Sequence, residues 1–372
     1  MKKVAIVLSG IFILFLIGLI IISRNHKLNA SLFPKEFKIG MILCGSHDNG
    51  GLSEAHYKSV LSVAENRGLV LEFFENVPYD ERCREKIEEL IYDGCKLIIL
   101  DSGFFEEYSL PAAKAHPDTG FINFYGSGYS ENYLSFSGRM YQPSYLCGMV
   151  AGMQTGNGRI GYMAASPASE LICDINAFTL GVRKVNPDAT VYVGYTDATD
   201  GVLLISRLIE GYGIDVIMNN TYTDTVLRYA EKRGIWSMGC HMDHSDIYPD
   251  SYLTSMVWDL YDFYDSEIMS CREGLFTGKD IRLGIDSHFV DISPLTENVK
   301  PGIAGAVAEE RNRLINREYD VFYGPVYDSE GVLRAAENES IPDIELFNNL
   351  NWFVSGVEIY DSMQEQKLNE PG

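Results

Sequence analysis

Residues 38–60 read KIGMILCGSHDNGGLSEAHYKSV, and this stretch indicates which kind of fold to expect. The apolar run 38–44 predicts a strand, and residues 52–67 have the spacing of a helix that stops near Gly68. The turn between them has neither the G-x-G-x-x-G of a dinucleotide loop nor the GK[ST] of a nucleotide loop. It is still a strand-to-helix turn, where α/β folds place their ligands.

The same alternation of strand and helix continues along the chain. Strands are expected at 69–74, 96–100 and 120–124, with helices at 79–92 and 105–115 between them. A second series has strands at 159–164, 189–195, 215–218 and 235–239, with helices at 168–185, 202–212 and 225–233. Two such βαβ series predict an α/β protein with two doubly wound lobes built on parallel sheets.

The last third of the chain departs from this repetition. Strands are expected at 253–258, 289–292 and 319–325, helices at 259–276 and 307–316, and a last apolar segment at 352–357. These elements can complete both lobes only if the chain crosses between them more than once.

Composition disfavours one class of function. The formal net charge is −22 and the isoelectric point is about 4.7. Nucleic-acid binders that neutralise phosphates are usually basic, so no nucleic-acid partner is expected.

The N-terminus has the pattern of a membrane segment. Lys2 and Lys3 precede an uncharged run of 19 residues, 4–22, which is about the length that crosses a bilayer core. No good cleavage site and no lipid-acceptor cysteine follow this run. We therefore expect an uncleaved transmembrane helix within 1–24, a tether at 25–37 and a body on the extracellular side of a cell membrane. A cleaved signal segment is the alternative.

The seven cysteines are scattered and include no C-x-x-C pair. The odd number argues against a complete disulfide framework. Most lie in apolar runs, where cysteine is usually a small core residue. Pairing of Cys83 with Cys95 stays open.

Several ordered motifs resemble the basic membrane protein family of ABC-transporter solute receptors. They are FSGRMYQPSYLCGMVAGMQT (136–155), RIGYMAASP (159–167), INAFTLGVRKVNPDATV (175–191), VFYGPVYDSEG (321–331) and NWFVSGVE (351–358). The resemblance implies the type I periplasmic-binding-protein fold, with two Rossmann-like lobes joined by three crossovers. It implies a first lobe of 38–145 plus about 255–300, a second of 146–254 plus about 301–345, and a C-terminal segment at 346–372. It also implies a purine base or nucleoside as the ligand.

In the first lobe, the opening turn offers Asp48, Leu52 and Ser53. A carboxylate such as Asp48 can accept hydrogen bonds from ribose hydroxyls or from a purine N–H. The family has an aromatic residue where this chain has Leu52, which provides apolar contact but no ring stacking. Ser53 either contacts the ligand or caps the helix that begins there.

Two further groups in this half of the chain are candidates. Asp101, Ser102 and Phe104 follow the buried third strand, where the resemblance implies a ligand-contacting turn and a helix cap is the alternative. Tyr141 is expected where the lobes meet, either at the ligand or in interface packing.

In the second lobe, Asn176 is expected on a helix that borders the cleft, where an amide can read a purine edge. Tyr222 and Asp224 are alternative equivalents of a short ligand-binding turn of the family. Asp243 matches a family aspartate at the ribose end of the ligand. Trp258 stands where other branches carry a ligand-binding lysine, and it either stacks on the ligand or packs the crossover.

No metal or cofactor is expected. His241, Asp243 and His244 lack a helical i, i+4 pair and an evident fourth ligand. The chain has no nucleophile elbow and no phosphate loop, and the resemblance is to binding proteins, so no enzyme is expected.

The expected function is a receptor whose lobes close on a purine base or nucleoside and present it to an ABC permease in the membrane. The main alternative is a membrane-anchored sensor of the same fold without a transport role. A nucleoside-processing enzyme, with Asp48, Asp101 and Asp243 as acid and base, is less favoured.

Overall fold

The computed structural model describes residues 36–196 and 201–360. The expected anchor at 1–24, the tether up to residue 35 and residues 361–372 lie outside this described part. Within it, no helix combines the length and the apolar character needed to cross a bilayer.

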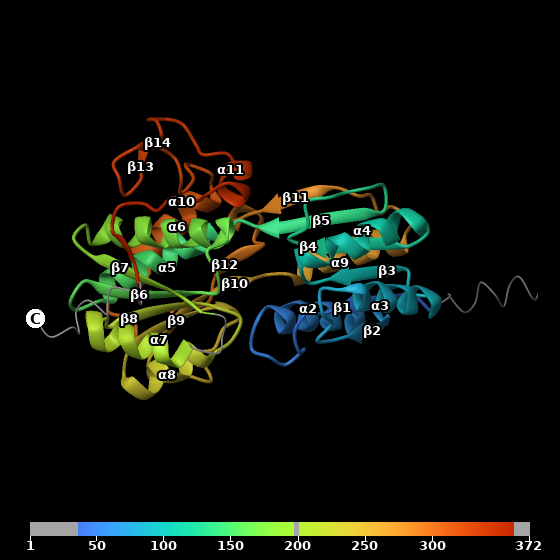
Figure 1. Ribbon diagram of the computed structural model, residues 1–372, viewed down its shortest axis with the longest axis horizontal. Coiled ribbons are helices and arrows are strands. Elements are labelled where there is room, and N and C mark those ends of the chain that lie inside the picture. Colours follow the sequence, from blue (N-terminus) through green and yellow to red (C-terminus); the bar gives the residue numbers. More distant parts are fainter. Residues whose placement is uncertain (1–35, 197–200, 361–372) are drawn as a thin grey trace, which may run out of the picture.

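Two lobes lie side by side, each built on its own sheet (Figure 1). The first sheet has six strands in the order β11-β5-β4-β3-β1-β2, and all neighbouring pairs are parallel. Its strands are β1 (Lys38–Ile42), β2 (Val70–Phe74), β3 (Leu97–Leu100), β4 (Gly120–Phe124), β5 (Tyr133–Gly138) and β11 (Asp280–Leu283). Helices α2 (Leu52–Arg67) and α9 (Tyr261–Arg272) pack together, as do α3 (Glu81–Tyr92) and α4 (Glu106–Ala115). The central strands are buried because helices cover both faces.

The second sheet has seven strands in the order β12-β10-β9-β8-β6-β7-β15. They are β6 (Arg159–Ala164), β7 (Thr190–Tyr195), β8 (Val216–Asn220), β9 (Trp236–His241), β10 (Tyr252–Trp258), β12 (Val290–Ile292) and β15 (Val357–Ile359). All neighbouring pairs are parallel except β10 with β12. Its helices are α5 (Tyr141–Gln154), α6 (Ser169–Val185), α7 (Gly201–Arg207), α8 (Thr225–Arg233) and α10 (Ile303–Ile315).

Helices α5 and α6 are in direct backbone contact. A Cβ atom on Gly148 would lie 2.0 Å from the Phe178 carbonyl oxygen, and one on Gly181 would lie 2.0 Å from that of Tyr145. Only glycine allows this approach, so the two glycines set the distance between the helices.

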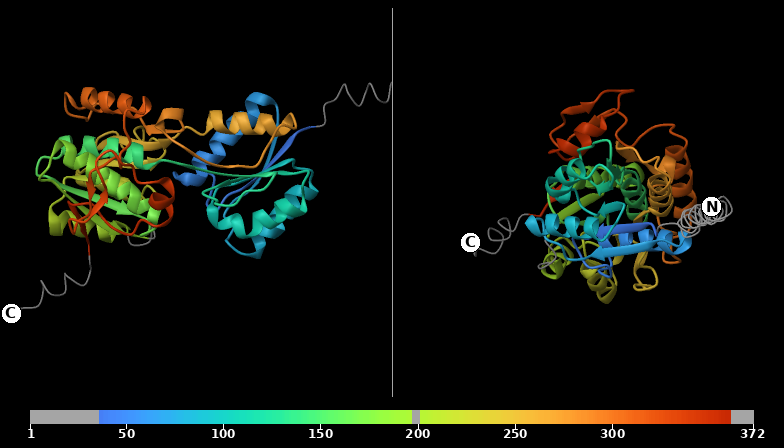
Figure 2. Two further views of the ribbon diagram at one scale, coloured as in Figure 1. Left: turned by 90° about the horizontal axis from the view of Figure 1, so that it is seen from above. Right: turned by 90° about the vertical axis from the view of Figure 1, so that its right-hand side faces the viewer.

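The chain passes between the lobes three times, at residues 138–141, 258–261 and 283–290 (Figure 2). The expected two-lobe fold with parallel sheets and three crossovers is therefore confirmed. The expected lobe boundaries differ from the strand pairing in places. The end of β10 from about residue 255 and all of β12 were expected in the first lobe, but these strands pair with each other in the second sheet, and β15 joins that sheet at its other edge.

Two local expectations also change. Residues 319–325 were expected to form a strand, but the strands nearby are β13 (Val326–Tyr327) and β14 (Leu333–Ala335), followed by α11 (Asp343–Asn348). All seven cysteines are free, so Cys83 and Cys95 do not form a disulfide.

Candidate ligand-binding cleft

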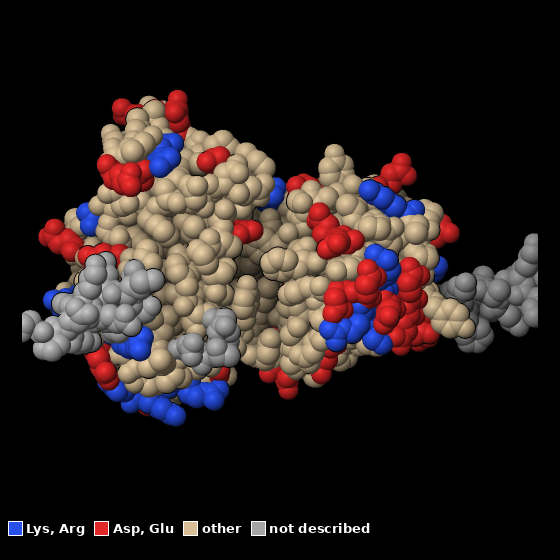
Figure 3. All heavy atoms as spheres, viewed as in Figure 1, with Lys and Arg blue, Asp and Glu red and all other residues tan. Residues whose placement is uncertain are grey.

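The two lobes touch where the turn after β1 meets the turns after β8 and β9. The Nε2 atom of His244 donates to the Gly50 carbonyl oxygen at 3.0 Å. A Cβ atom on Gly51 would lie only 2.7 Å from the Tyr222 carbonyl oxygen of the other lobe. On the face that Figure 3 shows, the surface is hollowed between the lobes, and few charged side chains border the hollow.

The turn after β1 is held in shape by a buried hydrogen-bond network around Asp101. The Asp101 carboxylate accepts hydrogen bonds from the Ser53 hydroxyl at 2.6 Å and from the Cys44 backbone N–H at 2.9 Å. The Ser53 oxygen also accepts from the Gly45 N–H at 3.1 Å. Burial raises the pKa of Asp101 to about 6, because the charged form is desolvated. Asp101 and Ser53 therefore support the turn from beneath, and Gly51 rather than Ser53 is the N-cap of α2.

The other predicted residues of the first lobe lie nearer the surface. Asp48 is exposed and accepts a hydrogen bond from the Ser46 hydroxyl at 2.6 Å. Leu52 is half-buried against the core. Ser102 caps the short helix η1 (Gly103–Phe105), and Phe104 is 71% exposed beside Tyr79.

Aromatic rings line the hinge side of the cleft. Trp258 packs edge-on against Phe124 and Tyr125 of the first lobe, with ring centroids 5.1 and 6.4 Å apart. Its indole Nε1–H donates to Nδ1 of His241 at 3.2 Å. Burial lowers the pKa of His241 to about 4, so this ring is neutral and its proton is on Nε2. Trp258 therefore packs the crossover and also lies at the base of the cleft.

The second lobe contributes carboxyl groups that the sequence reasoning missed. Asp174 on α6 is 7% exposed, and Asn220 at the end of β8 donates to it at 3.1 Å. Burial raises the pKa of Asp174 to about 8, and the nearby Glu170 carboxyl adds to the shift. The pKa of Tyr125 is raised well above its usual value, first by burial and then by the charges of Asp174 and Glu170. Tyr125 directly follows the predicted strand 120–124, and Asn220 lies in the turn after the predicted strand 215–218, so these positions were the signal available in the sequence.

Three predicted site residues form hydrogen bonds with other groups of the protein. The Asn176 amide donates to the Trp352 carbonyl oxygen and accepts from the Val354 N–H, so it holds the C-terminal segment instead of reading a ligand. The Tyr141 hydroxyl donates to Asp320 at 2.8 Å, within the second lobe. The Asp224 carboxylate is paired with Arg228 and Tyr248 at the start of α8.

Asp243 and Tyr222 remain at the rim of the second lobe. Asp243 is exposed and its carboxylate accepts from the Ser245 N–H at 3.0 Å. Tyr222 is 54% exposed. His241 and His244 are engaged with Trp258 and with two carbonyl oxygens, and the described residues contain no group of three potential metal ligands.

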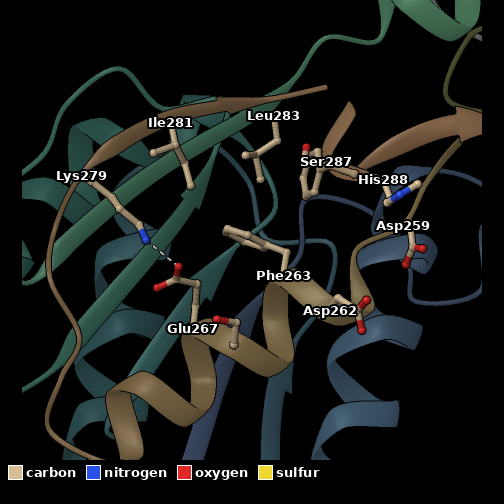
Figure 4. A pocket seen from close by; sticks show the side chains of 11 residues that line it. Asp259, Asp262, Phe263, Glu267, Lys279, Ile281, Leu283, Ser287 and His288 are labelled. Atoms are coloured by element: carbon tan, nitrogen blue, oxygen red, sulfur yellow. Dashed lines mark hydrogen bonds and ion pairs between the residues drawn. The ribbon is translucent and has the colours of Figure 1, made fainter. Parts of the chain in front are cut away.

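A second hollow of about 350 Å³ lies at the hinge (Figure 4). Phe263, Ile281 and Leu283 form its apolar side, and an ion pair between Glu267 and Lys279 closes one end. It is lined by α9, β11 and two crossovers, so it lies apart from the strand ends that face the interlobe cleft.

The fold and the cleft define a class of protein. Two largely parallel sheets joined by three crossovers, with turns that meet at the strand ends, are the two-lobed type I periplasmic-binding-protein fold. Three solved structures share this fold. The first is titled a transcriptional activator of the comK gene from Bacillus halodurans (TM-score 0.68, 21% identity, 76% of this chain and 99% of that one). The others are solute-binding proteins of ABC transporter systems from Conexibacter woesei (TM-score 0.65, 18% identity, 76% and 98%) and Aeropyrum pernix (TM-score 0.68, 16% identity, 76% and 92%).

Sequence comparison identifies the family. Residues 37–323 match the Bmp family, described as ABC transporter substrate-binding protein PnrA-like, and the chain belongs to it. A putative ABC transporter glucose-binding protein of Haloferax volcanii is 30% identical over 83% of this chain and 77% of its own length. A purine-binding protein of Brucella abortus is 26% identical over 87% and 93%. The family consists of extracytoplasmic solute-binding proteins, not enzymes, so the nucleoside-processing alternative is set aside.

Proposed function

We propose that this protein is a receptor for a purine base or nucleoside, held at the outer face of a cell membrane by residues 1–24 and serving an ABC permease. The lobes close on the ligand because both contact it, which favours the closed arrangement. In this account Trp258, Tyr125, Tyr222 and Phe104 supply aromatic surface, while Asp48 and Asp243 accept hydrogen bonds at the rim.

The observation that carries the proposal is the aromatic base of the cleft. Trp258 and Tyr125 lie next to each other, with neutral His241 fixed against the indole. Flat heteroaromatic ligands gain apolar burial and edge contacts from such rings. Trp258 can thereby supply the aromatic surface that Leu52, a leucine at the family's aromatic position, does not provide.

Two relatives point to different ligands, and this difference is testable. The Brucella relative is named for purine and the Haloferax relative for glucose. The full chain in mild detergent should be heated with adenine, adenosine, guanosine, hypoxanthine or glucose. Saturation at about 100 times Kd stabilises a protein by about 2.7 kcal/mol, which raises Tm by several degrees. A shift with a purine supports the proposal, and a shift with glucose alone would replace it by a sugar receptor.

A sensor without a transport role is the second candidate. It is favoured by likeness to the transcriptional activator protein med of Bacillus subtilis, which is 23% identical over 70% of this chain and 84% of its own length. Deleting the gene and measuring purine uptake separates the two functions. Unchanged uptake with altered expression of other genes would support the sensor.

A further inference from the structure

Two nearly buried polar side chains on the second lobe, Asn220 and Asp174, each have one oxygen atom without a hydrogen-bond partner among residues 36–196 and 201–360. Asn220 is 3% exposed, and its Nδ2 atom donates both to the Tyr162 hydroxyl at 2.9 Å and to Oδ2 of Asp174 at 3.1 Å. Both acceptors fix the orientation of the amide. Among the described residues, Oδ1 of Asn220 and Oδ1 of Asp174 have no hydrogen-bond partner. Neither oxygen atom is fully enclosed by the protein, so each can still be reached.

This pair lies on the wall of the cleft. Asn220 is the last residue of β8, directly before the turn whose Tyr222 carbonyl meets Gly51 of the other lobe. Asp174 interacts electrostatically with Tyr125 at the end of β4 in the first lobe. A ligand between the lobes would therefore meet the two free oxygen atoms from the second-lobe side.

We propose that Asp174 and Asn220 read the edge of a 6-aminopurine, an inference that rests on the proposed purine receptor. The neutral carboxyl of Asp174 donates its O–H to a ring nitrogen, and the Asn220 oxygen accepts from the exocyclic amino group. An adjacent donor and acceptor on the protein match an adjacent acceptor and donor on the adenine edge. A 6-oxopurine presents the reverse order of ring N–H and oxygen and fits this arrangement less well.

The protonation of Asp174 is consistent with this role. Its pKa is raised to about 8, first by burial and then by Glu170. Burial keeps the pKa values of the surrounding phenols and thiols above their usual values. The titratable groups around Asp174 are Glu170 and Cys173 on α6, Tyr162 on β6, Cys240 on β9 and Tyr125 after β4, with Arg282 acting on Glu170.

The pH sets which ligand edge fits. Below pH 8 the neutral carboxyl donates, whereas above pH 8 the carboxylate can only accept and repels a ring nitrogen lone pair. Adenine affinity should therefore fall by up to about tenfold per pH unit above pH 8. Guanine, which carries two adjacent N–H donors, should not lose affinity over the same range.

The test is calorimetric titration of the full chain with adenine and guanine at pH 6.5 and pH 9. We expect adenine to bind more tightly at pH 6.5 and to lose about tenfold at pH 9. The Asp174→Asn variant keeps one donor and one acceptor, so it should bind adenine within about threefold of wild type and show no such loss. Glu170→Gln is the matched control on the same helix and should keep the loss.

The outcomes separate two failures. If no purine binds the wild-type chain at millimolar concentration, the purine receptor itself fails. If purines bind but adenine affinity is the same at both pH values, or if guanine is preferred at pH 6.5, the proposed role of Asp174 and Asn220 is wrong. The proposed purine receptor is not contradicted by either result. The wild-type pH comparison decides this even if Asp174→Asn does not fold.

Discussion

Replacing Gly51 by alanine tests whether the turn after β1 and the turn after β8 meet when ligand is bound. The added Cβ would lie 2.7 Å from the Tyr222 carbonyl oxygen. An ordinary contact begins near 3.4 Å, so the opposing backbone must retreat by about 0.7 Å. Because this oxygen belongs to the main chain of the other lobe, it cannot rotate away as a side chain would. The closed arrangement is therefore destabilised more than the separate lobes are.

The size of the effect follows from the cost of overpacking. Forcing extra atoms into a tight contact costs about 1–3 kcal/mol. If this cost falls on the closed state alone, ligand affinity drops by about 5- to 150-fold. The backbone at Gly51 has φ −132° and ψ −151°, an extended conformation that alanine also adopts, so no backbone strain is expected.

Two matched variants isolate the interlobe contact. Gly51 is the N-cap of α2, where serine is a better cap than alanine but carries the same Cβ. Gly51→Ser should therefore weaken ligand binding as Gly51→Ala does, without loss of Tm in the absence of ligand. Gly305→Ala on α10, where a Cβ meets open space, should leave Kd unchanged and should not lower Tm, since alanine favours a helix over glycine. Calorimetric Kd values for both Gly51 variants that equal the wild-type Kd would refute the reasoning.

Three further changes have expected outcomes. His244→Ala removes the hydrogen bond to the Gly50 carbonyl and should raise Kd by about 3- to 10-fold, and it should also lower Tm without ligand because the residue is only 4% exposed. His56 is fully buried and its pKa is lowered to about 3, so its contribution to stability is present above pH 6.5 and is lost as pH falls from 6.5 toward 3. Relative to a His56→Gln variant, wild type should lose about 2 kcal/mol more stability in urea unfolding between pH 7.5 and pH 5, because the other shifted groups (His241, Asp101 and Asp174) are common to both proteins. The same pH dependence in both proteins would exclude His56 as the cause. Gly181→Ala drives a Cβ into the Tyr145 carbonyl and should destabilise the second lobe by about 3 kcal/mol or more, so a Tm equal to that of wild type would contradict the packing of α5 on α6.

The alternation of strands and helices was predictable because most elements have a clear period and end at a glycine or proline. Strand β5 and helix α5 were not assigned from periodicity. All of α5 except Met153 is buried, so the helix has no polar face to produce a 3.6-residue pattern. The resemblance of residues 136–155 to a family identified this region where periodicity could not.

The site was predictable in position but not in the use of each side chain. Strand ends located the turns at residues 44–53 and 219–224, and Gly51 of the first turn lies against the Tyr222 carbonyl of the second, in the other lobe. Sequence could not show that Asn176 is consumed by the backbone at Trp352 and Val354, because those partners lie more than 170 residues away. Asp174 was missed for the converse reason. It lies within a helix, and only the fold shows that its carboxyl is buried beside Asn220 at the end of β8.

The most direct test of the central claim is a calorimetric titration of the full chain, in mild detergent at neutral pH, with a panel of purines and with glucose. The account predicts saturable binding of one purine per chain and no heat of binding with glucose. Saturable binding of glucose together with no binding of any purine at millimolar concentration would contradict it.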